Sequence, residues 1–293
     1  MKIDTLITVL GWEDRFLKGT AIILKKYDIA SMILISFTDY LSMNNMKENK
    51  SKIEKKATEL NIEIKYIKLT YADSVNNWKT LGAFFEKNEI GNDILINTTT
   101  FPRETIWTLL FFLKSSVNKV NYIYFKPGKY SDDWLTKNHK NPRLLFKHSG
   151  IFNLDQKLVL FIITGYDPNR MNSIIEYYEP DKIIIFNQNG KQFNNKIRNN
   201  IVNIDNSLDF EKVEINNYDV EIATMEIRNK IIEYSDYNII IASQGPKLSA
   251  LSTYKNFLMS DSRIALAYVP VRDFNSEYSS GFNPNYIKGI LEL

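Results

Sequence analysis

The sequence predicts an α/β protein made of two tandem Rossmann-like units with mainly parallel sheets in a pseudo-two-fold arrangement. Three observations lead to this prediction. Short apolar runs alternate with charged, helix-permissive stretches, the two halves of the chain open with the same order of elements, and a later stretch of each half aligns at one constant offset. Alternating strands and helices are typical of parallel βαβ units, whose helices cover both faces of the sheet.

Composition narrows the class of protein. The chain has 293 residues, of which 44% are hydrophobic and 24% charged, and this length suits two units of about 150 residues. A net charge of only +3 argues against binding long duplex nucleic acid. The absence of cysteine excludes disulfides and thiolate chemistry and favours a cytoplasmic location. No run approaches the roughly 20 apolar residues that span a bilayer, so we expect no membrane association.

The first predicted strand of each half ends in a glycine loop. These strands cover Asp4–Leu10 and Leu158–Thr164, and each is followed by glycine, an aromatic residue, an acid, an arginine and then a helix. The loops are candidate ligand contacts, although a tight turn closed by an Asp–Arg pair is the alternative explanation. The candidate residues are Gly11, Trp12, Arg15, Gly165, Tyr166 and Arg170.

The following elements also recur. Second strands are predicted at Ser31–Phe37 and Lys182–Asn187 because short apolar runs of this kind are typical of buried parallel strands. Helices are expected at Met46–Leu60 and Val220–Tyr234. A further strand at Glu63–Leu69 is expected only in the first half, so the two copies diverge most in this part.

The clearest correspondence follows the next strands, Asn92–Asn97 and Asn238–Ala242. Each strand runs into hydroxyl residues, a proline and a cation, and the prolines and the cations are both 144 residues apart. The same offset continues without gaps into the predicted strands Asn121–Phe125 and Ile264–Val269. The candidate ligand contacts in these loops are Asn97, Thr99, Thr100, Arg103, Ser243, Gln244, Gly245 and Lys247.

These loops have the chemistry of an anion site. Ligands of open parallel sheets bind beyond the carboxyl ends of the strands. There Thr99, Thr100 and Ser243 could cap the next helix, whose free N–H groups favour an anion, and Arg103 and Lys247 would add positive charge. We therefore expect a small-ligand site, for a nucleotide, where the equivalent loops meet. A hydroxyl residue followed by proline is also an ordinary way to begin a helix, so a cap without a ligand is the alternative.

Residues 97–103, Asn-Thr-Thr-Thr-Phe-Pro-Arg, resemble the motif after the fourth strand of CRISPR-associated Rossmann-fold (CARF) sensor domains, which has Asp or Asn, then Ser or Thr, then Arg or Lys. The second copy matches at Ser243 and Lys247, whereas Ile241 stands where Asp or Asn is expected. The resemblance implies a fused pair of sensor domains that bind a cyclic oligoadenylate or related nucleotide in antiviral defence.

Many CARF proteins carry a nuclease or DNA-binding module, whereas the two predicted units occupy all of this sequence. We expect units at residues 1–140 and 156–293, and an effector on a separate chain or a homo-oligomer. Three functions remain open at this point: a nucleotide-binding sensor or regulatory protein, a ring-nuclease-like enzyme that cleaves a cyclic oligonucleotide, and a partner-binding subunit without a ligand. Neither histidine, His139 or His148, has metal-ligand spacing, so neither a metal nor a cofactor is expected.

An aromatic-x-x-acid-aromatic pattern recurs at residues 130–134 and 274–278. Such rings could stack on nucleobases. They could equally fix the last strand of each unit to its core.

Overall fold

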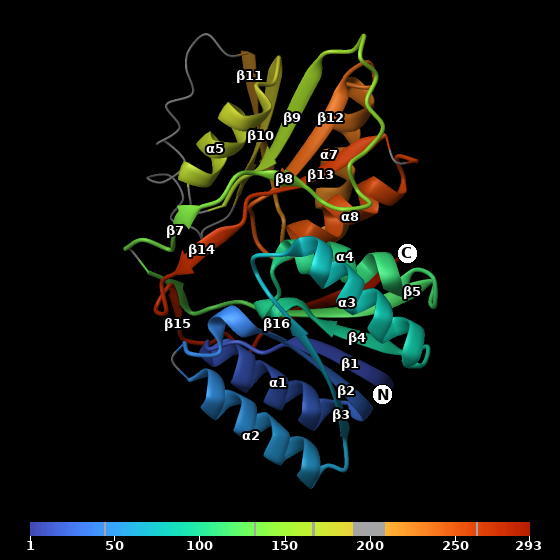
Figure 1. Ribbon diagram of the computed structural model, residues 1–293, viewed down its shortest axis with the longest axis vertical. Helices are drawn as coiled ribbons and strands as arrows, with labels where there is room; N and C mark the ends of the chain where they lie inside the picture. The colour runs from blue at the N-terminus through green and yellow to red at the C-terminus, as the bar shows by residue number, and fades with distance from the viewer. Residues whose placement is uncertain (44, 132, 166–167, 190–208, 262) are drawn as a thin grey trace. The chain divides into compact units, whose positions relative to one another are not determined.

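A computed structural model describes residues 1–43, 45–131, 133–165, 168–189, 209–261 and 263–293 (Figure 1). The chain forms two compact units, one made of Met1–Trp134 together with Phe274–Leu293 and the other of Leu135–Asp273. Each contains a six-stranded, largely parallel sheet, which confirms the predicted α/β fold class. Across the described ranges, no helix combines the length and the hydropathy needed to span a membrane.

The sheet of the first unit has the order β16-β5-β4-β1-β2-β3. Neighbours from β5 to β3 pair in parallel, and β16 pairs with β5 in the antiparallel sense. Helices α1 and α2 cover one face, and α3 and α4 cover the other (Figure 1). The strands are β1 (Lys2–Val9), β2 (Asp28–Phe37), β3 (Glu63–Leu69), β4 (Ile94–Asn97), β5 (Lys119–Phe125), β6 (Lys129–Tyr130), β15 (Ser279–Ser280) and β16 (Tyr286–Glu292). The helices are α1 (Asp14–Lys26), α2 (Met46–Glu59), α3 (Ser74–Lys87) and α4 (Arg103–Leu113), with 3-10 turns η1 (Thr38–Tyr40) and η2 (Thr98–Thr100).

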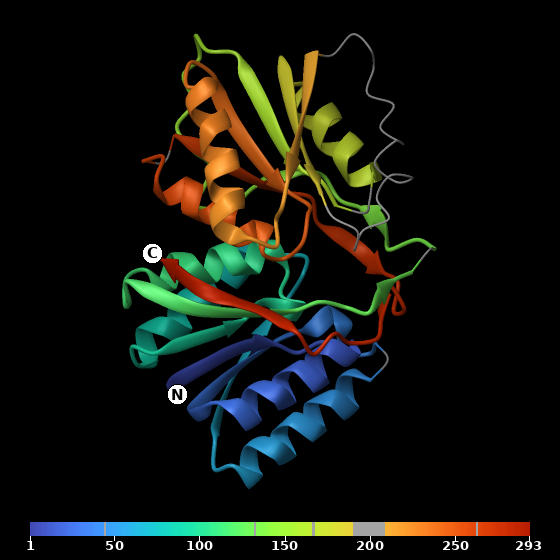
Figure 2. The same cartoon turned by 180° about the vertical axis from the view of Figure 1, so that it is seen from behind.

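The sheet of the second unit has the order β11-β10-β9-β12-β13-β8, again parallel except for the last pair. Helix α7 packs on α8, and both lie on the face opposite α5 (Figure 2). The strands are β7 (Thr136–His139), β8 (Arg143–Leu144), β9 (Leu158–Ile163), β10 (Lys182–Gln188), β11 (Asp209–Ile215), β12 (Asn238–Ser243), β13 (Ile264–Tyr268) and β14 (Val271–Phe274). The helices are α5 (Pro168–Tyr178), α7 (Val220–Glu233) and α8 (Ser249–Leu258).

The central strands are the most apolar because they are covered on both faces. All four residues of β4 are buried, and so are all six of β12. Parallel strands in such a position are typically continuous hydrophobic runs. In the second unit the core beneath α5 joins Leu160 and Ile162 of β9 to Ile174 of the helix.

The two sheets share one strand order. Counted from the same edge, β3, β2, β1, β4, β5 and β16 of the first unit correspond to β11, β10, β9, β12, β13 and β8 of the second. In both units the connections reverse direction between the first and the fourth strand, which creates a topological switch point. Ligands of open α/β sheets bind at such points, beyond the carboxyl ends of the strands.

The sixth strands are exchanged between the units. In sequence, β8 follows β5 and β16 follows β13, and the 144-residue offset aligns β8 with β16. In the structure β8 pairs with β13, whereas β16 pairs with β5. The contacts therefore group Phe274–Leu293 with the first unit, which differs from the boundaries of 1–140 and 156–293 expected from sequence. Local sequence patterns do not specify whether an antiparallel edge strand pairs with the fifth strand of its own half or with that of the other half.

Strand β11 is a second difference, since no strand was expected in this part of the second half. Its residues alternate in exposure, and only Ile215 is buried. Phe210, at the start of the strand, is 39% exposed. An edge strand of this kind lacks the continuous apolar run that identifies its neighbours.

The exchanged strand β16 gives a direct test of this topology. Leu291 is fully buried, whereas its neighbour Ile290 is 51% exposed. We expect Leu291→Ala to lower the free energy of unfolding by about 2–5 kcal/mol through cavity formation. Ile290→Ala, the matched control, should change it by less than about 0.5 kcal/mol. Chemical denaturation measures both, and equal small changes would show that β16 does not complete the core.

Candidate functional site

The two predicted loops of the first unit meet at its switch point. A Cβ atom added to Gly11 would lie 2.7 Å from Cγ2 of Thr100. Thr100 in turn donates its hydroxyl to the carbonyl oxygen of Val9, at 2.6 Å. The loop after β1 and the turn after β4 are thus in direct contact, although they are far apart in sequence.

The second unit repeats this contact. A Cβ atom on Gly165 would lie 2.0 Å from the carbonyl oxygen of Gln244, and the Gln244 amide donates to the Ile163 carbonyl at 2.8 Å. Gln244 is the equivalent of Thr100 under the 144-residue offset. A side chain at Gly165 would overlap the backbone of the neighbouring loop, whereas one at Gly11 would displace the Thr100 side chain. The predicted contact Tyr166 lies outside the described residues.

Asn97 and Thr99 are buried and hold the turn η2 in place. The Asn97 Oδ1 accepts from the backbone amide and the hydroxyl of Thr99, at 3.4 and 2.5 Å. Its Nδ2 donates to the hydroxyls of Thr8 and Thr20, at 3.2 and 3.4 Å. The Thr99 hydroxyl also accepts from the Phe125 amide at 3.1 Å. These two side chains therefore shape the loop from within the core.

The predicted helix caps are wrong. Helix α4 begins at Arg103, and its N-cap residue, Pro102, makes no side-chain hydrogen bond. The threonines form η2 because Asn97 caps that turn instead. In the second unit Ser243 shares a hydrogen bond of 2.6 Å with the hydroxyl of Ser249, the first residue of α8, rather than with a backbone amide.

The cations of these loops lie where the two helices begin. Arg103 is the first residue of α4, and Lys247 lies in the turn before α8; both are partly exposed. Glu104 shares the first turn of α4. Gly245 is buried, and a Cβ atom there would lie 3.1 Å from the carbonyl oxygen of Thr164.

Arg15 is part of a buried hydrogen-bond network. Its guanidinium pairs with the carboxylate of Glu13 and donates to the hydroxyls of Tyr124 and Tyr278, at 3.4 and 2.6 Å. Tyr278 and Ser279 both donate to Glu13, each at 2.5 Å. Only 2% of Arg15 and 7% of Glu13 are exposed. The pair closes the turn, and it joins the loop after β1 to the C-terminal segment.

Both members of this pair stay ionised. Burial on its own would raise the pKa of Glu13, but the charge of Arg15 and the hydrogen bonds that the carboxylate accepts hold this pKa below its ordinary value. Burial acts in the opposite direction on Arg15, where Glu13 keeps the pKa well above its ordinary value. A buried ion pair of this kind is stable only while both partners are present.

Arg170, the equivalent arginine of the second unit, is also largely buried. It donates to the carbonyl oxygen of Val269 at 2.6 Å, and its guanidinium lies 5.6 Å from the ring centre of Tyr268. Tyr268 is equivalent to Tyr124, so in each unit the arginine of the first loop meets the tyrosine of the fifth strand.

Trp12 belongs to an aromatic cluster. Its ring centre lies 5.9 Å from that of Tyr40 and 6.1 Å from those of Phe274 and Tyr278. The aromatic pattern at 274–278 thus packs against the loop after β1 of the first unit, whereas the structural alternative expected it to fix the last strand of its own unit to the core. Trp12 remains partly exposed.

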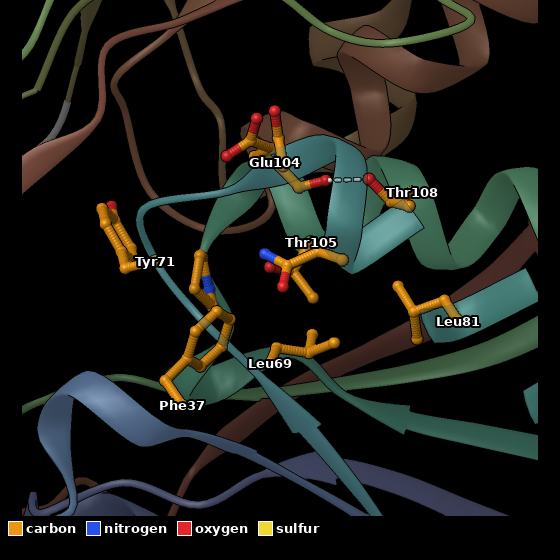
Figure 3. A pocket seen from close by; sticks show the side chains of 10 residues that line it. Phe37, Leu69, Tyr71, Leu81, Glu104, Thr105 and Thr108 are labelled. Atoms are coloured by element: carbon orange, nitrogen blue, oxygen red, sulfur yellow. Dashed lines mark hydrogen bonds between the residues drawn. The ribbon is translucent and has the colours of Figure 1, made fainter. Parts of the chain in front are cut away.

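A small pocket lies beside the start of α4 (Figure 3). The labelled side chains Phe37, Leu69 and Tyr71 face Glu104 and Thr105 across it. Its volume of about 10 Å³ is the space of one water molecule. Sequence patterns gave no indication of this pocket, because its walls come from the ends of β2 and β3 as well as from α4.

A larger, open pocket of about 550 Å³ is lined by the loop after β1 together with residues from the ends of the first unit's two chain segments. This volume is in the range of small-ligand sites. Its charged residues are mostly acidic, with only Lys129 positive. The lining residues are Trp12, Glu13, Asp14, Asn45, Lys129, Tyr130, Ser131, Asp133, Ser276, Glu277, Ser279, Ser280 and Gly281. The patterns at residues 130–134 and 274–278 marked part of this lining in the sequence, but not that the two patterns meet beside Trp12, because only the strand exchange brings residues 276–281 here.

The described residues hold no cluster of three or more histidine, aspartate or glutamate side chains placed to bind a metal ion. His148 is buried, with its ring centre 4.6 Å from that of Phe257 and its Nδ1 3.0 Å from the Phe146 carbonyl oxygen.

No protein-family model matches the chain, and a comparison with curated proteins finds no relative. The structure of a Type III CRISPR defence DNA nuclease activated by cyclic oligoadenylate is similar, with a TM-score of 0.54 over 96% of this chain and 68% of that one. The two sequences are 5% identical, so this likeness shows a shared fold. The UDP complex of S. aureus MnaA covers 87% of this chain and 77% of its own at 10% identity, but its TM-score of 0.22 carries no weight.

The switch-point contact predicts a difference between two glycine substitutions. In Gly165→Ala the methyl group meets a backbone carbonyl at 2.0 Å, whereas in Gly11→Ala it meets a threonine methyl at 2.7 Å. We expect Gly165→Ala to destabilise the protein by about 1–3 kcal/mol and Gly11→Ala by less, because a side chain can rotate away. Thermal unfolding tests this, and an unchanged melting temperature for Gly165→Ala would contradict the contact.

The buried pair predicts a pH-dependent stability difference. Glu13→Gln leaves Arg15 buried without a counter-charge and should cost about 3–5 kcal/mol near neutral pH. Because the pKa of Glu13 is lowered in the folded protein, its contribution is complete above the ordinary carboxyl pKa and is lost as the pH falls through the lowered one. The difference in free energy of unfolding between the wild type and Glu13→Gln should therefore become smaller at acid pH.

Melting curves recorded at several pH values measure both the stability loss of Glu13→Gln near neutral pH and its decrease in acid. Asp14→Asn is the matched control, since Asp14 is an exposed acid on the same loop that pairs with Lys18. It should change stability by less than about 1 kcal/mol. A Glu13→Gln variant as stable as this control would show that the pair does not hold the loop.

Proposed function

We propose that this protein is a nucleotide-responsive sensor whose ligand binds beyond the carboxyl ends of the strands, at the switch points. The observation that carries the proposal is the contact of Gly11 with Thr100, repeated by Gly165 with Gln244. This contact brings the loops after the first and fourth strands together at the carboxyl edge of each sheet, where ligands of open parallel sheets bind. A small ligand suits this arrangement better than long duplex nucleic acid, because the net charge is only +3.

The proposed phosphate contacts are Arg103 and Lys247. Arg103 stands at the start of α4, whose N-cap residue makes no side-chain cap, and the dipole of that helix favours an anion there. In α8 the first backbone amides donate to the carbonyl oxygens of Pro246, Lys247 and Leu248, so the second contact rests on the Lys247 side chain. Gly245 is buried against Thr164, so its lack of a side chain lets the two loops of the second unit pack closely. Phe101, the equivalent residue of the first unit, is fully buried and packs in the core rather than stacking on a base.

The acid-rich pocket beside Trp12 suits a nucleobase better than a phosphate. Its carboxylates repel a second anion, but carboxylates accept hydrogen bonds from the amino groups of bases. Trp12 and Tyr130 supply ring faces for stacking. Phosphate at the helix starts and base in this pocket would place one nucleotide across the loop Gly11–Arg15.

The resemblance of residues 97–103 to the CARF motif supports a cyclic oligonucleotide as the ligand and a role in antiviral defence. The structural neighbour, a nuclease activated by cyclic oligoadenylate, shares the fold. Cyclic oligoadenylates are therefore the first compounds to test. An effector on a separate chain, or a homo-oligomer, would transmit the response in the cytoplasm.

A thermal-shift screen with mono-, di- and cyclic oligonucleotides, followed by chromatography of each mixture, tests the proposal. Ligand at 100 times its Kd should add about 2.7 kcal/mol of stability. Binding that leaves the ligand intact is the expected result. Turnover would identify a ring-nuclease-like enzyme instead, and no shift with any nucleotide would favour a partner-binding subunit without a ligand.

The two cations should contribute unequally. Arginine can hold a phosphate with a bidentate fork, whereas lysine acts as a mobile point charge. We expect Arg103→Ala to weaken binding by roughly 1.5–3 kcal/mol and Lys247→Ala by less. Lys114→Ala, at the opposite end of α4, is the matched control and should bind normally. Calorimetry measures all three, and equal small losses would place the ligand elsewhere.

A further inference from the structure

A second pocket lies at the opposite edge of the sheet in the second unit. It is formed where β12 and β13 begin and where α7 and α8 end, and its volume is about 240 Å³. The nucleotide-binding loops proposed above lie at the carboxyl ends of these strands, so the two places are distinct. The lining residues are Ile151, Gln156, Arg228, Ile231, Ile232, Ser235, Tyr237, Asn238, Ile239, Ser260, Arg263 and Ile264.

The walls of this pocket combine apolar surface with positive charge. Five of the lining residues are isoleucines, two are arginines, and no carboxylate is present among them. In the part of the chain that the structure describes, neither Arg228 nor Arg263 forms an ion pair. The Nε of Arg263 donates only a long bond, 3.4 Å, to the carbonyl oxygen of Ser260. Both positive charges are thus available to a ligand.

One wall of the pocket is fixed by hydrogen bonds. The side chain of Asn238 accepts from the Asn153 amide at 2.8 Å and donates to the carbonyl oxygens of Asn153 and Gln156, at 2.7 and 2.9 Å. These bonds tie the loop that carries Ile151 to the start of β12. The pocket is therefore preformed, which reduces the entropy lost when a ligand binds.

Apolar side chains extend beyond the pocket. Ile151 and Ile232, which line it, are 70% and 60% exposed. Leu154 on the same loop as Ile151 is 99% exposed, and Met225 on the same helix as Ile232 is 59% exposed. Ile151 and Ile232 together give the pocket an exposed apolar rim, and exposed apolar patches mark interaction surfaces in soluble proteins.

We infer that this pocket is a docking site for a peptide segment of a partner protein, with an apolar side chain in the cavity and an acidic side chain at Arg228 and Arg263. The charge of the pocket selects an acidic segment, because an unpaired cation attracts a carboxylate and repels another cation. The cavity is smaller than the roughly 300–1,000 Å³ of pockets for drug-sized molecules, and it suits a single anchoring side chain. The surrounding apolar residues would contact the rest of the segment. A sensor that binds its ligand at one edge of the sheet would engage its effector at the other.

Phage display of random linear peptides against the whole protein tests this inference without knowing the partner. Selected peptides are counter-screened against the double variant Arg228→Glu, Arg263→Glu. Enriched sequences should pair an apolar residue with nearby aspartate or glutamate, and should be lost on the double variant. A library that yields no binder, or binders without acidic residues, would overturn the inference.

Fluorescence anisotropy with a selected peptide then measures how much each pocket residue contributes to the affinity for the peptide. Arg228→Gln and Arg263→Gln should each weaken binding by up to about fivefold, as for exposed ion pairs. Ile232→Ser should weaken it more strongly, whereas Ile222→Ser on the same helix should not, since Ile222 is 43% exposed but lies outside the pocket. Equal affinity of Ile232→Ser and wild type would contradict docking here.

A free aliphatic carboxylate is the alternative occupant. Calorimetry with hexanoate, and with hexanol as the uncharged control, separates it from a peptide. Arginine-dependent binding of hexanoate in a protein that selects no peptide would identify a small-molecule site and overturn peptide docking. The outcome is independent of whether the protein binds a nucleotide.

Discussion

The carboxyl edge of each sheet depends on a glycine that lets two loops touch. A methyl group on Gly165 would collide with the carbonyl oxygen of Gln244, and Gly11 packs closely against the side chain of Thr100. Because the first and fourth strands are neighbours, their following loops lie side by side, and a side chain at Gly165 would push them apart, while one at Gly11 would have to displace the Thr100 side chain. The start of α4, and with it Arg103, takes its position from the turn that this contact fixes.

A buried ion pair then couples the first loop to a distant part of the chain. Glu13 and Arg15 lie within one turn, yet their remaining hydrogen bonds go to Tyr124 on β5 and to Tyr278 and Ser279 before β16. The exchanged C-terminal segment is thus held both by strand pairing and by charge. Since isolated buried charges are costly, a movement of the loop after β1 must disturb this segment. Such coupling is a physical route by which a ligand at the loop could alter the rest of the first unit.

Much of this arrangement could be predicted from the sequence. Apolar runs located the central strands, because parallel strands covered on both faces are continuously hydrophobic. The constant offset between Pro102 and Pro246 identified equivalent loops, and the shared strand order agrees with that equivalence. A turn closed by an Asp–Arg pair was predicted as the alternative to a ligand contact; Arg15 does close the turn, but with Glu13, while Asp14 pairs with Lys18.

Other features could not be predicted, for physical reasons. The exchange of β8 and β16 depends on long-range antiparallel pairing, which no local pattern encodes. The Thr99 hydroxyl points into the core, where it donates to the side-chain oxygen of Asn97. It therefore cannot cap helix α4, as the sequence had suggested. The large pocket beside Trp12 combines residues near position 13 with residues 276–281, and only the folded first unit brings them together. The docking pocket of the second unit likewise gathers isoleucines from a loop, a helix and two strands.

The most direct test of the central claim is a crystal structure of the protein with a bound cyclic oligoadenylate. We expect a phosphate within hydrogen-bond distance of Arg103 and a base beside Trp12, with the loop Gly11–Arg15 against the ligand. A ligand bound away from both switch points, with these loops unoccupied, would contradict it.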